Sequence, residues 1–157
     1  MRTPETIVLL LGALIATSAL AQSPFQQDGT GPLVMDAEHF ESTAGGSGFA
    51  PWQIIREASA SLGGAVKAAP GSATTTAGSG PRLDYLADFV STGRHYVCLR
   101  FRSFDSGKDS VFAQLAGGTI RSLDLDPDTG TWQWSCFTKR LSVPTPGTHT
   151  LTIYRRE

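Results

Sequence analysis

The chain is short of net charge, and this shortage excludes two classes of partner. Its 157 residues carry 13 basic and 14 acidic side chains, which gives a formal net charge of −1. The charges are interspersed along the sequence, without the basic patch that nucleic-acid binding needs and without a polybasic tract for a membrane surface. We therefore expect no nucleic-acid partner.

Long apolar runs are also lacking, except near the amino end. Met1–Ala21 has the plan of a secretory signal peptide, with Arg2 at its start, an apolar run over Ile7–Ala16 and a small-x-small cleavage site at Ala19–Ala21. The alternative is a membrane anchor, but the run is too short to span about 30 Å of hydrocarbon comfortably. We predict a secreted or periplasmic chain that starts at Gln22 and has no membrane span.

Catalytic and metal-binding motifs are missing as well. The sequence has no Gly-x-Ser-x-Gly elbow, no phosphate-cradling glycine loop and no Cys-x-x-Cys pair. His39, His95 and His149 lie on separate expected strands without the spacing of zinc ligands. We expect a non-catalytic protein. A small polysaccharide-degrading enzyme stays an alternative, because glycosidase carboxylates need only proximity in space.

Cysteine is limited to Cys98 and Cys136. An even number of cysteines in an exported chain predicts a disulfide, and both lie in the middle of expected strands. Two buried free thiols are the alternative. The bond requires the two Cα atoms to lie within about 7 Å, so the two strands must be neighbours or directly apposed.

Short alternating segments separated by turn residues fill the rest of the sequence. In Arg82–Phe104, apolar and polar residues alternate on both sides of the turn Ser91–Gly93, which predicts a β-hairpin. Further strands are expected over residues 32–41, 51–57, 109–116, 131–138, 139–144 and 148–155. No amphipathic helical stretch occurs after the signal, so the pattern predicts an all-β sandwich or barrel over residues 32–157. Residues 22–31 are expected to be a flexible lead, and residues 42–48, 69–81 and 124–130 to be loops, of which 69–81 is expected to be mobile.

One face of the second hairpin strand is unusual. Val97, Leu99 and Phe101 are expected to point inward, so Tyr96, Cys98, Arg100 and Arg102 would lie on the outer face. On a later strand, Trp132, Trp134 and Cys136 share one side. If the cysteines meet, the aromatic and arginine side chains gather on one sheet face.

Such a face suits a sugar. An indole covers the flat C–H patch of a sugar ring, and arginine holds its hydroxyls or a uronate carboxylate. Two alternatives stand beside this one: both tryptophans fill the interior, or the sugar binds at a loop end beside Trp52. The candidate carbohydrate-binding residues are Trp132, Trp134, Tyr96, Arg100 and Trp52.

Four segments, taken in order, resemble the carbohydrate-binding modules of families 6 and 35. They are MDAEHF at residues 35–40, YLADFVSTGRHYVCLR at 85–100, Asp109–Val111 before a Gly-Gly pair, and WQW followed by PGTHTLTIYRRE at 146–157. The resemblance implies an antiparallel, galactose-binding-like β-sandwich of the jelly-roll type. It also implies an exported, non-catalytic module that binds a poly- or oligosaccharide, fused to or associated with a glycan-active enzyme. The alternative is a structural or protein-interaction sandwich without a sugar site.

Two further expectations come from the same resemblance. The family continues past the segment that matches Arg155–Glu157 into one more strand, so the last strand is expected to be missing here. The opening strand carries Asp36 and Glu38, two residues apart and hence on one face. The resemblance implies a structural calcium site there, because paired carboxylates repel each other unless a cation lies between them. A solvated acidic face is the alternative. Asp124–Gly130 has acids at alternate positions but lacks calcium-loop spacing, and it is expected to be a polar turn.

Overall fold

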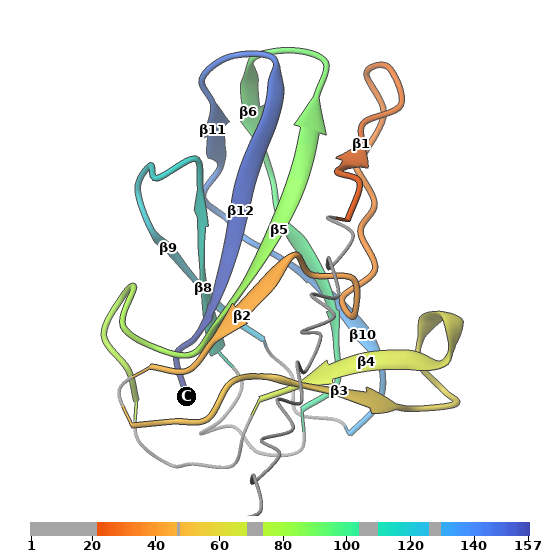
Figure 1. Cartoon of the computed structure of the whole chain (residues 1–157), viewed down its shortest axis with the longest axis vertical. Coiled ribbons are helices and arrows are strands. Elements are labelled where there is room, and N and C mark those ends of the chain that lie inside the picture. Colours follow the sequence, from red (N-terminus) through yellow and green to blue (C-terminus); the bar gives the residue numbers. More distant parts are fainter. Residues whose placement is uncertain (1–21, 47, 69–73, 104–109, 126–129) are drawn as a thin grey trace, which may run out of the picture.

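The computed structural model describes residues 22–46, 48–68, 74–103, 110–125 and 130–157 (Figure 1). The predicted signal peptide lies outside these residues. Apart from one short 3-10 turn, η1 (Ser61–Gly63), the regular elements of the described residues are strands. The strands are β1 (Phe25–Gln26), β2 (Ser42–Ala44), β3 (Gln53–Arg56), β4 (Gly64–Lys67), β5 (Arg82–Phe89), β6 (Gly93–His95), β7 (Cys98–Phe101), β8 (Ser110–Leu115), β9 (Arg121–Asp124), β10 (Gln133–Cys136), β11 (Leu141–Val143) and β12 (Gly147–Arg155).

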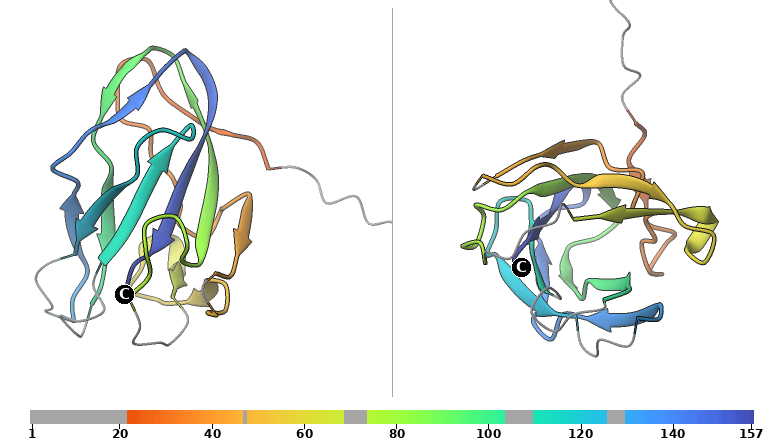
Figure 2. Two further views of the ribbon diagram at one scale, coloured as in Figure 1. Left: turned by 90° about the vertical axis from the view of Figure 1, so that its left-hand side faces the viewer. Right: turned by 90° about the horizontal axis from the view of Figure 1, so that it is seen from below.

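The strands form two layers, so the predicted β-sandwich is confirmed. The larger sheet has the order β1-β5-β12-β8-β9, and β2 also pairs with β5. The second layer is made of the antiparallel pairs β11-β6 and β10-β7, and the hairpin β3-β4 forms a separate two-stranded sheet. Figure 2 shows the layers around a common interior, with the hairpin at one end of the sandwich.

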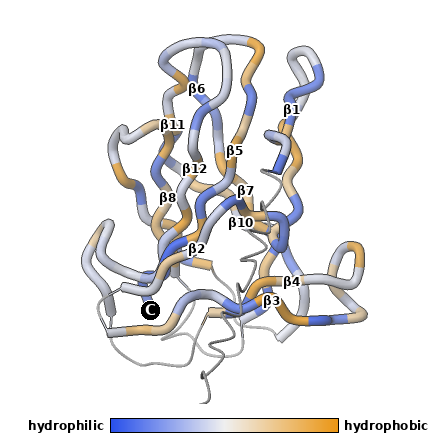
Figure 3. The backbone as a smooth tube through the Cα atoms, in the orientation of Figure 1, coloured by the Kyte–Doolittle hydropathy of each residue, from blue (hydrophilic) through white to orange (hydrophobic). Residues whose placement is uncertain are grey.

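The core lies where the apolar sides of these strands meet. Along β5, Leu83, Tyr85, Ala87 and Phe89 are buried and alternate with more exposed residues, as the sequence pattern predicts. Leu151 on β12 lies opposite Tyr85 in the antiparallel register. Burying one large apolar side chain contributes roughly 1.5–3 kcal/mol relative to exposure, so this alternation accounts for much of the stability. Hydrophobic and hydrophilic residues alternate along these strands in Figure 3.

The predicted hairpin over residues 82–104 is wrong in its pairing, although its strands are present. β5 pairs with β1, β2 and β12, whereas β6 pairs with β11 and β7 pairs with β10. The chain therefore crosses from one layer to the other between β5 and β6, and both apolar faces meet the same interior. Gly93 has a φ of 140° at this crossing, a conformation that side chains other than glycine rarely adopt.

The expected strand over residues 32–41 is also wrong. β12 covers one edge of β5, and β1 and β2 together occupy the other, so the intervening segment has no edge to join. It forms a turn in which the amide of His39 donates to the carbonyl of Asp36 at 3.1 Å. The buried hydroxyl of Tyr85 donates to the Ala37 carbonyl at 2.8 Å and ties the segment to the core.

Four shorter segments also differ from expectation. β1 lies in the expected flexible lead, and β2 lies in the expected loop over residues 42–48. Of the loop expected over residues 69–81, residues 69–73 lie outside the described part, but Thr75 is buried and its hydroxyl donates to the Arg155 carbonyl at 2.6 Å. β9 was not predicted, because three of its four residues are polar. Most of the expected turn over residues 124–130 lies outside the described residues.

Candidate functional site

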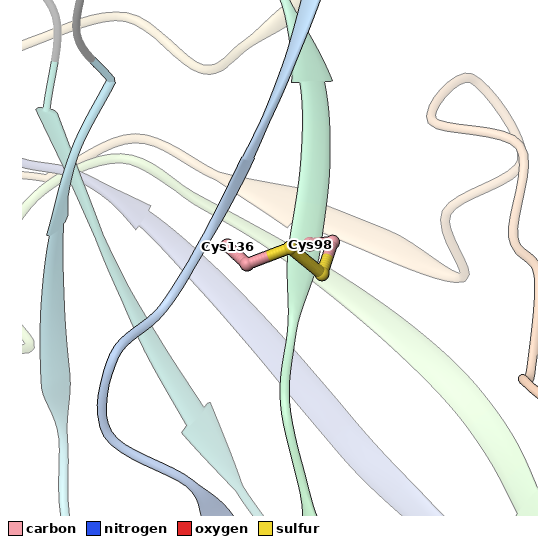
Figure 4. The surroundings of a disulfide bond; sticks show 2 residues. All are labelled: Cys98 and Cys136. Carbon is pink, nitrogen blue, oxygen red and sulfur yellow. A yellow bond between two sulfur atoms is a disulfide. The ribbon is translucent and has the colours of Figure 1, made fainter.

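A disulfide joins the two strands that carry the candidate aromatic residues. Cys98 on β7 lies directly opposite Cys136 on β10, with their Cα atoms 3.9 Å apart (Figure 4). The predicted disulfide is therefore confirmed, and the described residues hold no free cysteine. Both cysteines are exposed, so the bond lies on the outer side of the second layer.

The bond marks a surface that we call the β7–β10 face, made of Tyr96, Cys98, Arg100, Arg102, Trp132, Trp134 and Cys136. Trp134 lies opposite Arg100 in the register and is 66% exposed, and Tyr96 is 53% exposed. The other side of the same strands points inward and includes the buried Phe101 and Phe137. The interpretation that both tryptophans fill the interior is therefore wrong for Trp134.

Trp132 has a different environment from Trp134. The guanidinium carbons of Arg100 and Arg102 each lie 5.3 Å from the centre of its ring. Its indole N–H donates to the hydroxyl of Ser59 at 2.9 Å. Trp132 thus restrains the side chains of both arginines, because cation–π contacts of this kind hold a guanidinium over a ring.

The β3–β4 hairpin completes this support. Arg102 donates to the carboxylate of Glu57 at 2.7 Å, and Ser59 donates to the other oxygen of that carboxylate, also at 2.7 Å. Hydrogen bonds from Ser59 and Arg102 hold the pKa of Glu57 below its usual value. Arg100 reaches the hydroxyl of Ser61 at 3.3 Å. Glu57 is thus ionised at neutral pH and fixes the position of Arg102.

Tyr96 has its own arginine neighbour. The guanidinium carbon of Arg140 lies 4.8 Å from the centre of the Tyr96 ring. Arg140 covers part of that ring, whereas the side chain of Trp134 makes no ring contact or hydrogen bond among the described residues. Trp134 therefore offers the most available aromatic surface of this face.

Trp52 lies away from the β7–β10 face. It is partly buried against the core, and its indole N–H donates to the Pro81 carbonyl at 3.1 Å. This environment matches a packing role, so the structure groups four of the five candidate residues and leaves Trp52 out.

The carboxylates of Asp36 and Glu38 do not share a strand face, because their segment forms a turn. A side-chain oxygen of Asp36 lies 3.5 Å from Nδ1 of His39, and Glu38 packs against Gly64. Within the described ranges, no three His, Cys, Asp or Glu side chains lie close enough together to hold a metal. Calcium takes six to eight oxygen ligands, so most of them would have to be backbone carbonyls and water. Calcium binding here stays a prediction.

The residues that support the two arginines were not predicted from the sequence. Glu57, Ser59 and Ser61 are about 40 residues away from Arg100 and Arg102 along the chain, as the separations of 39 and 45 in two of their contacts show. Only the position of the β3–β4 hairpin beside β7 brings them together. The contact of Arg140 with Tyr96 was missed for the same reason, because the two residues are also distant along the chain.

The sequence of residues 27–157 matches the glycosyl hydrolase family 115 C-terminal domain. The chain belongs to this family. A search of curated protein sequences gave no match. Within the described residues, no helix is long and apolar enough to cross a membrane.

Solved structures share the fold. A family 35 carbohydrate-binding module from Clostridium thermocellum has a TM-score of 0.56 at 14% identity, over 76% of this chain and 84% of that one. The exo-beta-1,3-galactanase of Phanerochaete chrysosporium, solved with galactose, has a TM-score of 0.56 at 24% identity. This match covers 78% of the present chain and 26% of the galactanase, so the chain spans about a quarter of that enzyme. The predicted resemblance to galactose-binding-like carbohydrate-binding modules is confirmed.

Proposed function

We propose that this chain is an exported, non-catalytic carbohydrate-binding module, and that a poly- or oligosaccharide binds on the β7–β10 face. The observation that carries the proposal is the exposed indole of Trp134, opposite Arg100 and next to a disulfide. Family membership and fold support a carbohydrate-binding role for the domain as a whole. They do not place a ligand, so the site is argued from its side chains.

Each part of the face has a distinct role in this proposal. Trp134 stacks on the apolar side of one sugar ring, and Tyr96 contacts a neighbouring ring. Arg100 donates hydrogen bonds to hydroxyls or to a carboxylate of the glycan. Trp132 and Glu57 restrain the arginines before the ligand arrives, which lowers the conformational entropy lost on binding.

The shape and position of the face favour a polymer. Trp134 on β10 and Tyr96, two residues before β7, are both more than half exposed. An open surface leaves room for a chain to continue in both directions beyond the contacted sugars. We infer an accessory role beside a glycan-active enzyme, either fused or associated, because the family is named as a C-terminal domain of glycosyl hydrolases.

The two alternatives make different demands on these residues. A glycosidase needs a general acid with a raised pKa, whereas the pKa of Glu57, the carboxyl group beside this face, is lowered. A protein-interaction surface would also use exposed aromatic and arginine residues, so binding must decide between protein and glycan.

A glycan panel tests the proposal. The purified chain is titrated by calorimetry with neutral polysaccharides, with polysaccharides containing uronic acid, and with β-1,3-galactan, and each mixture is assayed for released reducing sugar. We expect saturable binding to at least one glycan without release of sugar. Absence of binding to every glycan of the panel would contradict the proposal and favour the protein-interaction alternative. Release of sugar would show that the chain is an enzyme.

A further inference from the structure

A second cluster of arginine lies at the edge of the sandwich, apart from Trp134. A recess of about 90 Å³ opens between the β8–β9 turn of the large sheet and β11 of the other layer. Figure 1 shows this turn beside β11. Its lining residues are Leu115, Gly118, Thr119, Arg121, Arg140, Leu141 and Ser142.

Arg121 occupies an unusual position for a cation. It lies two residues before Leu123, which is buried, so it projects from the same, interior side of β9. Its Nε is buried and has no hydrogen-bond partner among the described residues, although its backbone pairs with Ala113 of β8. A buried donor without an acceptor costs about 1–3 kcal/mol, and more when it is charged.

The rest of the lining does not relieve this cost. The residues around the recess include a second arginine and no carboxylate, and two of them, Leu115 and Leu141, are buried apolar residues. Two guanidinium groups beside one cavity repel each other unless an anion lies between them. Thr119 and Ser142 add hydroxyl groups that donate hydrogen bonds to an oxyanion.

We infer that this recess binds a small oxyanion, a carboxylate or sulfate group, between Arg121 and Arg140. Arginine presents its N–H groups as a planar fork that matches the oxygens of such groups. A volume of about 90 Å³ holds roughly three water molecules or one group of this size, since one water takes about 30 Å³. Arg140 also contacts Tyr96, so the recess borders the β7–β10 face.

The oxyanion has two sources, a free ion or an acidic group on a glycan, and the probes separate them. The ¹⁵N-labelled chain is titrated with sodium sulfate, sodium acetate, sodium glucuronate and neutral glucose, at ionic strength matched with sodium chloride. The Nε–H resonance of Arg121 reports on the recess directly. We expect saturable shifts with sulfate and the carboxylates at millimolar concentrations, and none with glucose. Equal affinity for acetate and glucuronate indicates a free anion, and tighter glucuronate binding indicates a sugar-borne acid.

Variants connect the response to the two arginines. Arg121→Met should abolish the anion-dependent rise in melting temperature, yet in chloride it should melt at the same temperature as the parent or higher, because it removes an unpaired cation. Arg140→Gln should weaken anion binding about tenfold, through loss of one charge-assisted contact. Arg56→Gln, an exposed arginine on β3, is the matched control and should respond like the parent.

Three results would overturn the inference. The first is the absence of a saturable shift with any oxyanion at 50 mM, about ten times the expected dissociation constant. The second is a response of Arg121→Met that equals that of the parent. The third is a lower melting temperature of Arg121→Met in chloride, which would make Arg121 a packing residue. Polysaccharide binding on the β7–β10 face is measured on the same variants. Its loss or retention tests the proposed function separately from the recess.

Discussion

Trp134 and Arg100 lie opposite each other across the β7–β10 ladder, two residues along each strand from the disulfide pair Cys136 and Cys98. Side chains directly opposite in an antiparallel pair share one face of the sheet. The disulfide fixes the register of these two short strands, so the indole and the guanidinium keep their relative positions. A ligand therefore meets an aromatic surface and a hydrogen-bond donor that are already arranged.

Replacing Trp134 with alanine should separate binding from stability. The side chain is 66% exposed and lies outside the core cluster, so we expect the melting temperature of Trp134→Ala to change by no more than about 2 °C. Glycan affinity should fall at least about tenfold, because a stacked aromatic ring is lost. Calorimetric titration with the best glycan of the panel, together with thermal unfolding, measures both quantities.

Trp52→Ala is the matched control for this prediction. Trp52 packs against the core and donates to Pro81, so its removal should cost about 2–4 kcal/mol of unfolding free energy. The fraction that stays folded should bind glycan as the parent does. A folded Trp134→Ala variant with full affinity would mean that the sugar binds elsewhere.

The sequence predicted which way strands face better than which strands they pair with. In β5, the alternation of Leu83, Tyr85, Ala87 and Phe89 placed the buried side correctly, because burial depends on residue type and a period of two. The same alternation over residues 32–41 was misleading. A strand also needs a free edge, and the edges of β5 are already taken by β12, β1 and β2.

The candidate site shows the same limit. The predicted cysteine pair connects β7 to β10 and brings Tyr96, Arg100, Trp132 and Trp134 to one region of the surface. Residue type alone could not separate Trp52, a packing residue, from the exposed Trp134. Interactions between distant segments, such as Arg102 with Glu57, depend on how the β3–β4 hairpin packs on the sandwich. A local sequence pattern does not predict that packing.

Removing the disulfide should destabilise the domain strongly. Cys98 and Cys136 are 38 residues apart in the sequence, and closing a loop of that length contributes about 4 kcal/mol in the chain-entropy model. We expect the double variant Cys98→Ala, Cys136→Ala to lose about 3–4 kcal/mol in urea denaturation and to bind glycan more weakly. Both cysteines are exposed, so reductant should reach the bond in the folded parent. Equal denaturation midpoints for the oxidised parent and the double variant would contradict this prediction.

The pair formed by Glu57 and Arg102 should make binding depend on pH in the acidic range. Because hydrogen bonds from Ser59 and Arg102 lower the pKa of Glu57 in the folded protein, the contribution of this carboxylate is fully present above its unfolded pKa of about 4.3. It is lost as the pH falls through the lower, folded value. We expect glycan affinity to be constant between pH 5 and 8 and to fall a few-fold below about pH 4.

Glu57→Gln tests this pH dependence. The amide is never charged, so the step below pH 4 should disappear, and affinity at pH 7 should already be near the acid value of the parent. Glu41→Gln, an exposed acid in another part of the chain, should keep the step. A parent whose affinity does not change down to pH 3 would show that Arg102 needs no carboxylate to hold its position.

Calcium binding at Asp36 and Glu38 should be weak if it occurs through these side chains. Two carboxylates give few charged ligands, and extracellular calcium modules of low ligand charge bind in the range of about 0.1–1 mM. We expect 5 mM calcium, several times that range, to raise the melting temperature of the parent and to have no effect on Asp36→Asn. Magnesium at the same concentration is the control for ionic strength. Identical melting curves of the parent with calcium and with magnesium would remove the calcium site.

The hydroxyl of Tyr85 should hold the segment over residues 32–41 in place. It is buried in the core and donates to the Ala37 carbonyl at 2.8 Å, which leaves that carbonyl without this donor in Tyr85→Phe. We expect the variant to lose about 1–2 kcal/mol of unfolding free energy, because the ring still fills its space while the acceptor loses its partner.

Hydrogen exchange should locate this loss. Amides near Ala37 should exchange faster in Tyr85→Phe, whereas those of β12 should keep the protection of the parent apart from the global change in stability. Burial also raises the pKa of Tyr85, with a smaller effect from Glu38, so the phenol keeps its proton and its bond up to at least the usual tyrosine value of about 10. The stability difference between the parent and Tyr85→Phe should accordingly be constant from pH 5 to 9 and shrink above about pH 10, where the phenol ionises in the unfolded chain while the folded one keeps its proton. A difference that disappears below pH 9, or uniform exchange across the chain, would mean that the hydroxyl does not anchor this segment.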